Sequence, residues 1–531
     1  TMTLHGQSII AGKTVDSTGE AFTATNPATG KSLEPVFHES PVEQADAALK
    51  AADAAFDEFR AKTPEERAKF LEAIADGIEA VGDPLLKRAN EETGLPMVRV
   101  TAERGRTTSQ ARLFAKLIRE GTWLEARIDK AIPDRAPLPK PDVRRMMVPV
   151  GPVVVFGASN FPLAISVAGT DTVSALGAGC PVVVKAHPGH PGTSEMIARV
   201  ITEAAEKTGM PAGVFSMVQG KGSEIGMALV KHPLTTAAAF TGSLRGGRAL
   251  FDAAASRPNP IPFYGELGSV NPVFLLPGAL QQRAPQIAEA FVTALTMGVG
   301  QFCTNPGLVF GVKSDGLQQF MEKTSFLVKG WQPASMLHAG ISDSFDTGVA
   351  RVLGTQGVDL VARSQTPANK EASQATAALF STDTASFESQ ASLREEVFGP
   401  TSIVTHAGSK EELESIAESF DGQLTASIHG TEDDLREHAR LIRILERKAG
   451  RIIFNGFGTG IEVCPSMHHG GPYPSSTHSH FTSIGTAAIY RFVRPVCYQG
   501  FPDDCLPEAI QNKNVTGAWR MVDGDMTKGD A

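Results

Sequence analysis

The stretch VVVFGASNFP, residues 153–162, indicates the fold. Its first four residues form an apolar run typical of a buried parallel strand, and a helix-length segment follows at 163–176. The same alternation continues with strands predicted at 181–184, 214–218 and 236–240 and a helix at 194–207. Strands alternating with helices build right-handed βαβ units. We therefore predict a doubly wound parallel sheet of the nucleotide-binding type, although the GxGxxG fingerprint is absent.

Helices are predicted before this sheet, and a second α/β domain after it. The segments SPVE (40–43) and TPEE (63–66) match capping boxes with a proline at the first helical position. Between Glu266 and Val463, predicted strands at 269–276 and 401–405 alternate with helical segments. The sequence thus indicates two α/β domains in one chain.

Composition limits the class of protein. A chain of 531 residues is too long for one hydrophobic core, so several domains are expected. The formal net charge of −9 argues against a nucleic-acid-binding surface. No run of about 18 uncharged apolar residues and no basic-then-apolar start is present, so we expect neither a membrane span nor a secretory signal. Five cysteines without a CxxC pair predict no zinc site and no disulfide framework, which fits the cytoplasm.

Two segments contain reactive side chains. Cys303 lies in GQFCTNP (300–306), where glycine and proline suggest an exposed turn and a nucleophilic thiol. Taken alone, this cysteine is better interpreted as structural. Glu266 lies in the apolar segment FYGELG (263–268), which makes it a candidate base with a raised pKa. A turn glutamate paired with a basic side chain is an equally good interpretation.

Two further segments follow strands of the predicted sheet, where ligands bind in α/β proteins. Asn160 can donate its amide N–H to a developing oxyanion, although an Asx turn is the more common role of asparagine at such a position. Gly242 and Ser243 close one strand and open a helix, whose N-terminus offers donors to a pyrophosphate. The alternative for Ser243 is an ordinary N-cap.

In this order along the chain, the four segments resemble those of the aldehyde dehydrogenase superfamily. The resemblance extends from about residue 6 to residue 499 and includes Lys185 after a strand, EEVFGP (395–400) and IFNG (453–456). Each motif is short, but their combination favours the catalytic interpretations over the structural ones.

The resemblance implies an aldehyde dehydrogenase-like α/β fold with two doubly wound α/β domains and a β-arm for oligomerisation. The implied parts are an NAD(P)-binding domain at 1–130 and 148–266, a catalytic domain at 267–482, an oligomerisation arm at 131–147 and 483–500, and a C-terminal tail at 501–531. We expect the apolar residues 487–490 to form an exposed edge strand, and the polar tail to be partly loose. The expected assembly is a homo-oligomer, either a dimer or a tetramer.

The resemblance also implies roles for single residues. Cys303 attacks the aldehyde as a thiolate, Asn160 and the Cys303 backbone N–H hold the oxyanion, and Glu266 activates the water that hydrolyses the thioester. The expected cofactor-binding residues are Lys185 at the adenosine ribose, Gly242 and Ser243 at the pyrophosphate, Glu396 at the nicotinamide ribose, and Phe398 beside the nicotinamide. No metal is expected.

Some positions depart from the common pattern of the superfamily. Pro188 replaces a glutamate that binds the adenosine ribose hydroxyls in many relatives, and Lys221 is a candidate partner for a 2′-phosphate. We therefore expect NADP to be accepted and even preferred, with NAD as the alternative. Ser269 stands where a second glycine is usual. His468, His469, His478 and His480 are interpreted as loop histidines.

The segments GASNFP (157–162), KAHP (185–188) and HGGPYP (469–474) resemble one branch of the superfamily most closely. That branch contains bacterial α-ketoglutaric semialdehyde dehydrogenases and NADP-linked fatty aldehyde dehydrogenases. It implies oxidation of α-ketoglutaric semialdehyde to α-ketoglutarate through a cysteine thioester. Phe161 and Ile165 are expected to form an apolar wall for a short chain, and Thr304 is a candidate donor. The sequence singles out no arginine for the substrate carboxylate.

Three alternatives stay open. The first is an NADP-dependent dehydrogenase of longer aliphatic or aromatic aldehydes. The second is a CoA-acylating enzyme, in which a thiol takes the acyl group; such relatives typically lack the glutamate base, so Glu266 argues against it. The third is an inactive relative with a structural or binding role, which is expected to have lost Cys303, Glu266 or Asn160, whereas all three are present.

Overall fold

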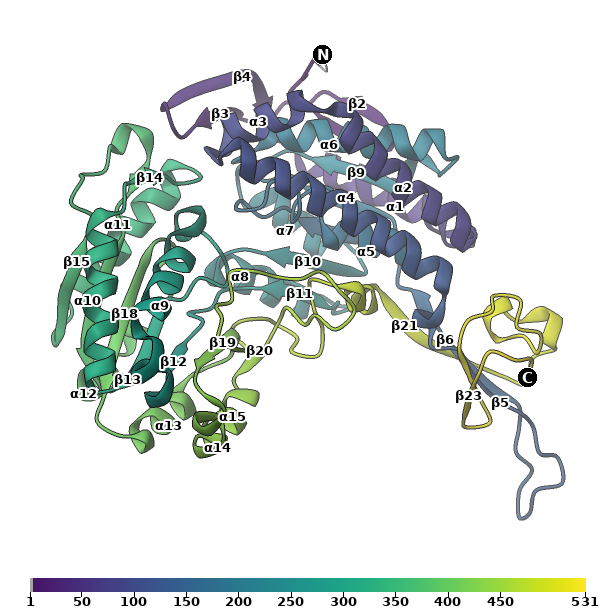
Figure 1. Ribbon diagram of the computed structural model, residues 1–531. Coiled ribbons are helices and arrows are strands. Elements are labelled where there is room, and N and C mark those ends of the chain that lie inside the picture. The colour runs from purple at the N-terminus through teal and green to yellow at the C-terminus, as the bar shows by residue number, and fades with distance from the viewer. Residues whose placement is uncertain (1–2) are drawn as a thin grey trace.

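The computed structural model describes residues 3–531, which form two α/β lobes and a projecting arm (Figure 1). The first lobe contains a seven-stranded sheet in the order β11-β10-β7-β8-β9-β1-β2. Strands β7 to β11 are parallel, and β1 is antiparallel to β9. The strands are β1 (Ser8–Ile10), β2 (Lys13–Val15), β7 (Val153–Phe156), β8 (Val182–Lys185), β9 (Phe215–Val218), β10 (Ala237–Thr241) and β11 (Phe263–Glu266).

Both faces of this sheet are covered, which explains the uninterrupted apolar runs. Successive side chains of β7 alternate between two hydrophobic cores, with Val153 and Val155 in one and Val154 and Phe156 in the other. The helices of this lobe are α1 (Val42–Ala61), α2 (Pro64–Val81), α3 (Asp83–Thr93), α4 (Met97–Glu120), α5 (Thr170–Ala178), α6 (Pro191–Lys207), α7 (Glu224–Lys231) and α8 (Leu244–Ala255). The predicted doubly wound sheet is therefore confirmed.

Two local predictions about the helix starts have different outcomes. The capping box at Thr63 is confirmed, because its Oγ1 accepts from Glu66 N at 3.2 Å and the Glu66 carboxylate accepts from Thr63 N at 2.7 Å. The capping box at Ser40 is wrong. Helix α1 begins after Pro41 without a side-chain cap, since Ser40 Oγ is hydrogen bonded to Ser8 Oγ at 2.6 Å instead.

The second lobe contains another seven-stranded sheet, in the order β15-β17-β18-β13-β12-β19-β20, with only β15 antiparallel to its neighbour. Its strands are β12 (Val273–Leu275), β13 (Leu308–Val312), β15 (Val358–Arg363), β17 (Ala378–Asp383), β18 (Thr401–Ala407), β19 (Gln423–His429) and β20 (Ala449–Phe454). Its helices are α9 (Pro277–Thr296), α10 (Asp315–Gly330), α11 (Ala339–Leu353), α12 (Thr384–Ser389), α13 (Lys410–Ser419), α14 (Glu432–Glu437) and α15 (Ala439–Glu446).

Short elements complete both lobes. The strand pairs are β3 (Ala21–Asn26) with β4 (Lys31–His38), and β14 (Ala334–Ser335) with β16 (Gln374–Ala375). The 3-10 helices are η1 (Thr122–Leu124), η2 (Ala212–Val214), η3 (Met297–Gly300), η4 (Lys370–Ala372), η5 (Ala391–Arg394), η6 (Thr486–Phe492), η7 (Asp503–Cys505) and η8 (Glu508–Ile510). Among residues 3–531, none of the helices combines the length and the apolar character that crossing a membrane requires.

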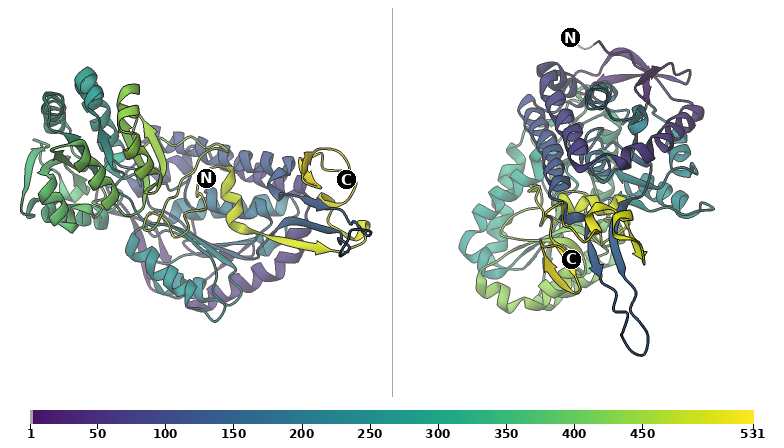
Figure 2. Two further views of the ribbon diagram at one scale, coloured as in Figure 1. Left: turned by 90° about the horizontal axis from the view of Figure 1, so that it is seen from below. Right: turned by 90° about the vertical axis from the view of Figure 1, so that its right-hand side faces the viewer.

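The arm is a five-stranded sheet that projects away from both lobes (Figure 2). Its order is β21-β6-β5-β22-β23, from β5 (Arg127–Asp129), β6 (Val143–Pro149), β21 (Val493–Gln499), β22 (Arg520–Val522) and β23 (Asp525–Thr527). The expectation of a loose tail is wrong for this part of the chain. Strand β22 of the tail pairs with β5, and Arg144 of β6 pairs with Asp503 at 3.0 Å and donates to the Ile510 carbonyl at 2.7 Å, which ties the tail to the arm.

The predicted edge strand at 487–490 is also wrong. These residues belong to the 3-10 helix η6, in which Ala488 and Ile489 are buried in the core of the first lobe. Arg491 fixes the helix there by pairing with Asp171 of α5 at 2.7 Å. Residues 483–492 therefore belong to the body of the protein, and the arm strand begins only at Val493.

Candidate active site

Cys303 lies on a loop with an unusual backbone between α9 and β13 (Leu308–Val312). Gly298, Val299 and Gly300 all have positive φ, at 56°, 58° and 67°. This conformation is strained for the β-branched Val299, and such strain is concentrated at functional sites. At Gly300 a side chain is impossible, because a Cβ would lie 2.3 Å from the backbone carbon of Gly399. The loop is thus forced into one path, which leads directly to Cys303.

The buried Asn271, which the sequence analysis did not single out, fixes the backbone of the Cys303 loop by hydrogen bonds. Asn271 Nδ2 donates to the Cys303 carbonyl at 2.8 Å and to the Asn305 carbonyl at 3.0 Å. The side chain of Asn271 is itself fixed by Ser269, whose Oγ donates to Asn271 Oδ1 at 2.9 Å. Ser269 Oγ also bonds to Gln423 Oε1 at 2.9 Å, so a serine at this position supports the nucleophile loop.

Three reactive groups meet at Cys303. Glu266 at the end of β11 is 5% exposed, and its Oε2 lies 2.9 Å from His469 Nε2. Cys303 Sγ lies 3.5 Å from the same nitrogen. The sulfur, the carboxylate oxygen and the ring nitrogen are all within 4.8 Å of one another. A thiol, a carboxylate and an imidazole in such contact can exchange protons, as nucleophilic catalysis requires.

The electrostatics of this cluster correct one prediction. Burial by itself raises the pKa of Glu266, but the charge of His469 and hydrogen bonds from His469 and Cys303 outweigh it, and the pKa lies below its usual value. The expected raised pKa is therefore wrong. Burial and the nearby Glu266 carboxylate raise the pKa of Cys303 well above its usual value. The thiol thus holds its proton next to an ionised base.

His469 does lie in a loop, as interpreted from the sequence, but that interpretation missed its contact with Glu266. Its side chain is 1% exposed and pairs with Glu266, whereas His478 packs against the ring of Tyr264 at 5.4 Å. The other nitrogen, Nδ1, is buried without a hydrogen-bond partner among residues 3–531. Only the position of His469 in the segment HGGPYP, already singled out by the resemblance, distinguished it from its neighbours in the sequence.

Asn160 lies within reach of the nucleophile loop. It follows β7, is 9% exposed, and its Nδ2 donates to the carbonyl of Gln301 at 3.1 Å. This bond orients the amide and uses one of its two N–H groups. The second N–H is left to stabilise an oxyanion that forms on a carbonyl bound at Cys303.

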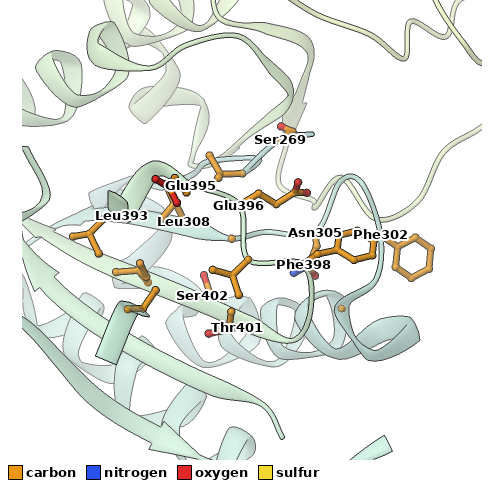
Figure 3. A pocket seen from close by; sticks show the side chains of 16 residues that line it. Ser269, Phe302, Asn305, Leu308, Leu393, Glu395, Glu396, Phe398, Thr401 and Ser402 are labelled. Carbon is orange, nitrogen blue, oxygen red and sulfur yellow. The ribbon is translucent and has the colours of Figure 1, made fainter. Parts of the chain in front are cut away.

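A pocket borders the other side of the Cys303 loop (Figure 3). Glu396 and Phe398 line it together with Phe302 and Asn305. Burial raises the pKa of Glu396 to about 8, so at neutral pH this carboxyl can donate a hydrogen bond as well as accept one. Both abilities suit a sugar hydroxyl. The backbone at Gly268 passes close to this carboxyl, because a Cβ at Gly268 would lie 2.7 Å from Glu396 Oε2.

The structure also fits a dinucleotide at the carboxyl ends of the first sheet. Ser243 caps α8, with its Oγ accepting from Gly246 N at 3.2 Å, and Gly242 precedes it directly after β10. The helix N-terminus therefore offers backbone donors to a pyrophosphate. At the end of β8, Lys185 Nζ donates to the Gly220 carbonyl at 2.6 Å and keeps two further N–H groups for ribose hydroxyls. Burial lowers the pKa of Lys185 to about 8.

The structure also reveals a carboxylate near Lys185 that the sequence analysis missed. Glu39 Oε1 accepts from the backbone N–H groups of Lys221 and Gly222 at 2.6 and 2.5 Å. Its charge raises the pKa of Lys185 against the larger, opposing effect of burial, which places it close to that amine. Pro188 replaces the usual glutamate near Lys185, but Glu39 brings a carboxylate to the same region from another segment. The absence of a glutamate at position 188 is therefore a weaker argument for a preference for NADP.

We expect Glu39→Gln to shift the cofactor preference toward NADP. A carboxylate beside the adenosine ribose repels a 2′-phosphate, so its removal should raise the ratio of kcat/KM for NADP to that for NAD about tenfold. Initial rates with both cofactors at a saturating aldehyde measure the ratio. Glu20→Gln, at an exposed position nearby, is the control. An unchanged ratio in Glu39→Gln would show that this carboxylate does not face the phosphate.

The predicted substrate residues lie in an apolar cluster. Phe161 and Ile165 pack together with Phe302, and the partly buried Ile461 and Val463 contact the same cluster. Thr304 is 1% exposed, and the backbone at Gly458 covers it so closely that a Cβ at Gly458 would be 3.1 Å from the Thr304 Cβ. The structure therefore places Phe161 and Ile165 at the apolar wall near Cys303, whereas Thr304 is covered.

Comparisons with known proteins agree with this geometry. Residues 14–492 match the model of the aldehyde dehydrogenase family. The chain is 47% identical to alpha-ketoglutaric semialdehyde dehydrogenase 2 of Azospirillum brasilense over 98% of this chain and 99% of that protein. It is 48% identical to the alpha-ketoglutaric semialdehyde dehydrogenase of Acinetobacter baylyi over 83% of each chain. A betaine aldehyde dehydrogenase of Staphylococcus aureus, solved with NAD+, has a similar fold with a TM-score of 0.80, 20% identity, and coverage of 94% of this chain and 96% of that one.

Proposed function

The chain belongs to the aldehyde dehydrogenase family, and on that premise we propose that it oxidises α-ketoglutaric semialdehyde to α-ketoglutarate with NAD or NADP. One structural observation carries the proposed chemistry: the Cys303 sulfur, the Glu266 carboxylate and the His469 ring nitrogen lie within 4.8 Å of one another. The substrate is supported by two relatives named for this semialdehyde, at 47% and 48% identity.

The proposed reaction uses the groups of this cluster in turn. The thiol of Cys303 gives its proton to the Glu266–His469 pair, and the thiolate attacks the aldehyde carbon. The second N–H of Asn160 and the backbone N–H of Cys303 stabilise the oxyanion of the thiohemiacetal. NAD or NADP would be held by Lys185, Ser243 and Glu396, and it would accept the hydride that leaves the thiohemiacetal carbon, so that the C=O bond re-forms and a thioester to Cys303 remains.

The remaining step releases the acid. After the proton from the thiol has passed to solvent, Glu266 is ionised again because His469 lowers its pKa, and it takes a proton from water as the water oxygen bonds to the thioester carbon. The carbon–sulfur bond then breaks, and the sulfur of Cys303 regains a proton. A lowered pKa suits this role, because the carboxylate stays ionised through the neutral range.

Relative efficiencies with a panel of aldehydes test the substrate. We expect kcat/KM for α-ketoglutaric semialdehyde to exceed that for succinic semialdehyde, hexanal and a long-chain aldehyde. The apolar cluster around Phe161 and Ile165 can contact the hydrocarbon chain of a longer aldehyde as well as that of a short one, so the long-chain aldehyde is the decisive comparison. If it is preferred at least about tenfold, which equals about 1.4 kcal/mol in transition-state binding, the semialdehyde is not the substrate. Assays with and without CoA distinguish hydrolysis from acyl transfer to a thiol.

We also propose that the arm joins subunits into a homo-oligomer. Within residues 3–531, strand β21 pairs only with β6 and forms an edge of the arm sheet. Residues 494, 495, 497 and 499 of this strand are exposed. An unpaired edge offers its backbone groups to a strand of a second copy of the chain.

A further inference from the structure

We propose that Arg106 is the specificity-determining cation of the substrate pocket, whose guanidinium binds the carboxylate of an acidic aldehyde. This inference rests on the proposed function in that it names the residue that recognises the acid group of the substrate. Four observations carry it. Arg106 lies beside the apolar wall, and its guanidinium lacks hydrogen-bond partners in the described part of the chain. Its charge interacts with Cys303 and Glu266, and the two neighbouring arginines already have hydrogen-bond partners.

Arg106 lies on α4 and faces the apolar wall of the pocket. Its guanidinium carbon is 5.1 Å from the centroid of the Phe161 ring. The Phe161 ring packs edge-on against that of Phe302 at 5.6 Å, and Phe302 directly precedes Cys303. A single layer of aromatic side chains thus connects the guanidinium with the nucleophile. Guanidinium groups stack on aromatic faces, and this contact fixes the plane of the fork.

The guanidinium of Arg106 is unsatisfied. Its Nε and Nη2 atoms are buried and have no hydrogen-bond partner among residues 3–531. A buried donor without a partner costs free energy, and a buried charge without one costs more. Such a group is expected where a ligand completes its hydrogen bonds, and a carboxylate with its two oxygens matches the arginine fork.

Cys303 and Glu266 lie within electrostatic range of Arg106. Burial lowers the pKa of Arg106, while the charges of Glu103, Cys303 and Glu266 act in the opposite direction. In return, Arg106 lowers the pKa of Cys303 against the larger effects of burial and Glu266. The positive charge is therefore located close enough to Cys303 to attract a substrate anion toward the nucleophile.

The neighbouring arginines already have partners. Arg99 pairs with Glu103 at 2.5 Å, and Glu103 accepts the backbone N–H groups of Leu163 and Ala164 at 2.8 and 2.9 Å. Arg99 therefore supports the turn after Asn160. Arg451, whose pKa Cys303 also affects, donates to the carbonyls of residues 458 and 460 at 2.7 and 2.9 Å. Of the three, Arg106 alone has no hydrogen-bond partner for its guanidinium in the part of the chain that the structure describes.

The test replaces Arg106 and compares aldehydes of equal length. Arg106→Met keeps the length of the side chain and removes the charge. For α-ketoglutaric semialdehyde we expect KM to rise and kcat/KM to fall about 10- to 100-fold, because bonds to a charged group are lost. For pentanal, which lacks the carboxylate, the change should stay within about threefold. Arg106→Lys, which keeps the charge but not the fork, should give an intermediate loss.

Two controls separate binding from folding. Arg104→Met, on the same helix, should leave the efficiency for both aldehydes unchanged. The thermal unfolding temperature of Arg106→Met should equal or exceed that of the wild type, because an unpartnered buried charge is removed. Equal losses for the acid and for pentanal, or an unchanged efficiency for the acid, would overturn the assignment of Arg106.

A second substrate pair distinguishes this inference from the proposed function. Succinic semialdehyde and butanal have the same chain length and differ in charge. If the wild type does not favour α-ketoglutaric semialdehyde, but Arg106→Met selectively weakens succinic semialdehyde relative to butanal, the proposed substrate is wrong and the anion site stands. If neither acid depends on Arg106, the anion site is wrong whichever substrate the wild type prefers.

Discussion

Cys303→Ala is expected to lower the rate of aldehyde oxidation by at least about 10⁴-fold, because the covalent route begins at this sulfur. The structure sharpens the expectation. Cys303 is the thiol that contacts both His469 and Glu266, while Cys180 is fully buried at the end of α5 and Cys497 and Cys505 lie on the surface. The measurement is the steady-state formation of reduced cofactor.

Cofactor binding separates a chemical role of Cys303 from a structural one. The affinity of Cys303→Ala for NAD or NADP, measured by calorimetry, should stay within about threefold of the wild type, because the proposed cofactor residues Lys185 and Ser243 lie on other segments. Cys505→Ala should keep full activity. Near-normal turnover in Cys303→Ala would rule out the thioester mechanism as a whole.

Glu266→Gln is expected to stop the reaction after its first half. The amide keeps the shape of the side chain but cannot take a proton from water, so the thioester accumulates. Rapid mixing should show a burst of about one equivalent of reduced cofactor per active site, followed by turnover at least about 10³-fold below that of the wild type. Mass spectrometry of the quenched protein should find the acyl group on Cys303.

Two variants bracket this result. Glu462→Gln, at an exposed position of the loop after β20, should turn over normally. In His469→Asn the carboxylate of Glu266 stays buried but loses the partner that lowers its pKa, so that pKa should rise above its wild-type value. Deacylation requires the ionised form, and its rate should therefore decline at a higher pH than in the wild type. If Glu266→Gln gives neither a burst nor an adduct, Glu266 does not serve deacylation.

The sequence predicted the architecture because its signals are local. Apolar runs such as residues 153–156 and 182–184 appear uninterrupted in the sequence, since both faces of a parallel sheet are covered. The capping box at Thr63 likewise depends on residues three positions apart. The box at Ser40 failed for the opposite reason, because its hydroxyl bonds to Ser8, which is distant along the chain.

The chemistry of single motifs was also readable from the sequence, but their mutual arrangement was not. Short motifs in the order that resembles the superfamily predict Cys303, Glu266 and Asn160 as catalytic residues. The tertiary structure alone decided that His469 lies against Glu266, that Glu39 reaches the loop at Lys221, and that Arg106 stands without a partner beside Phe161. Each of these facts joins residues dozens to hundreds of positions apart. A pKa or an unpaired charge depends on which distant groups the fold brings within a few ångströms, and no local pattern contains that information.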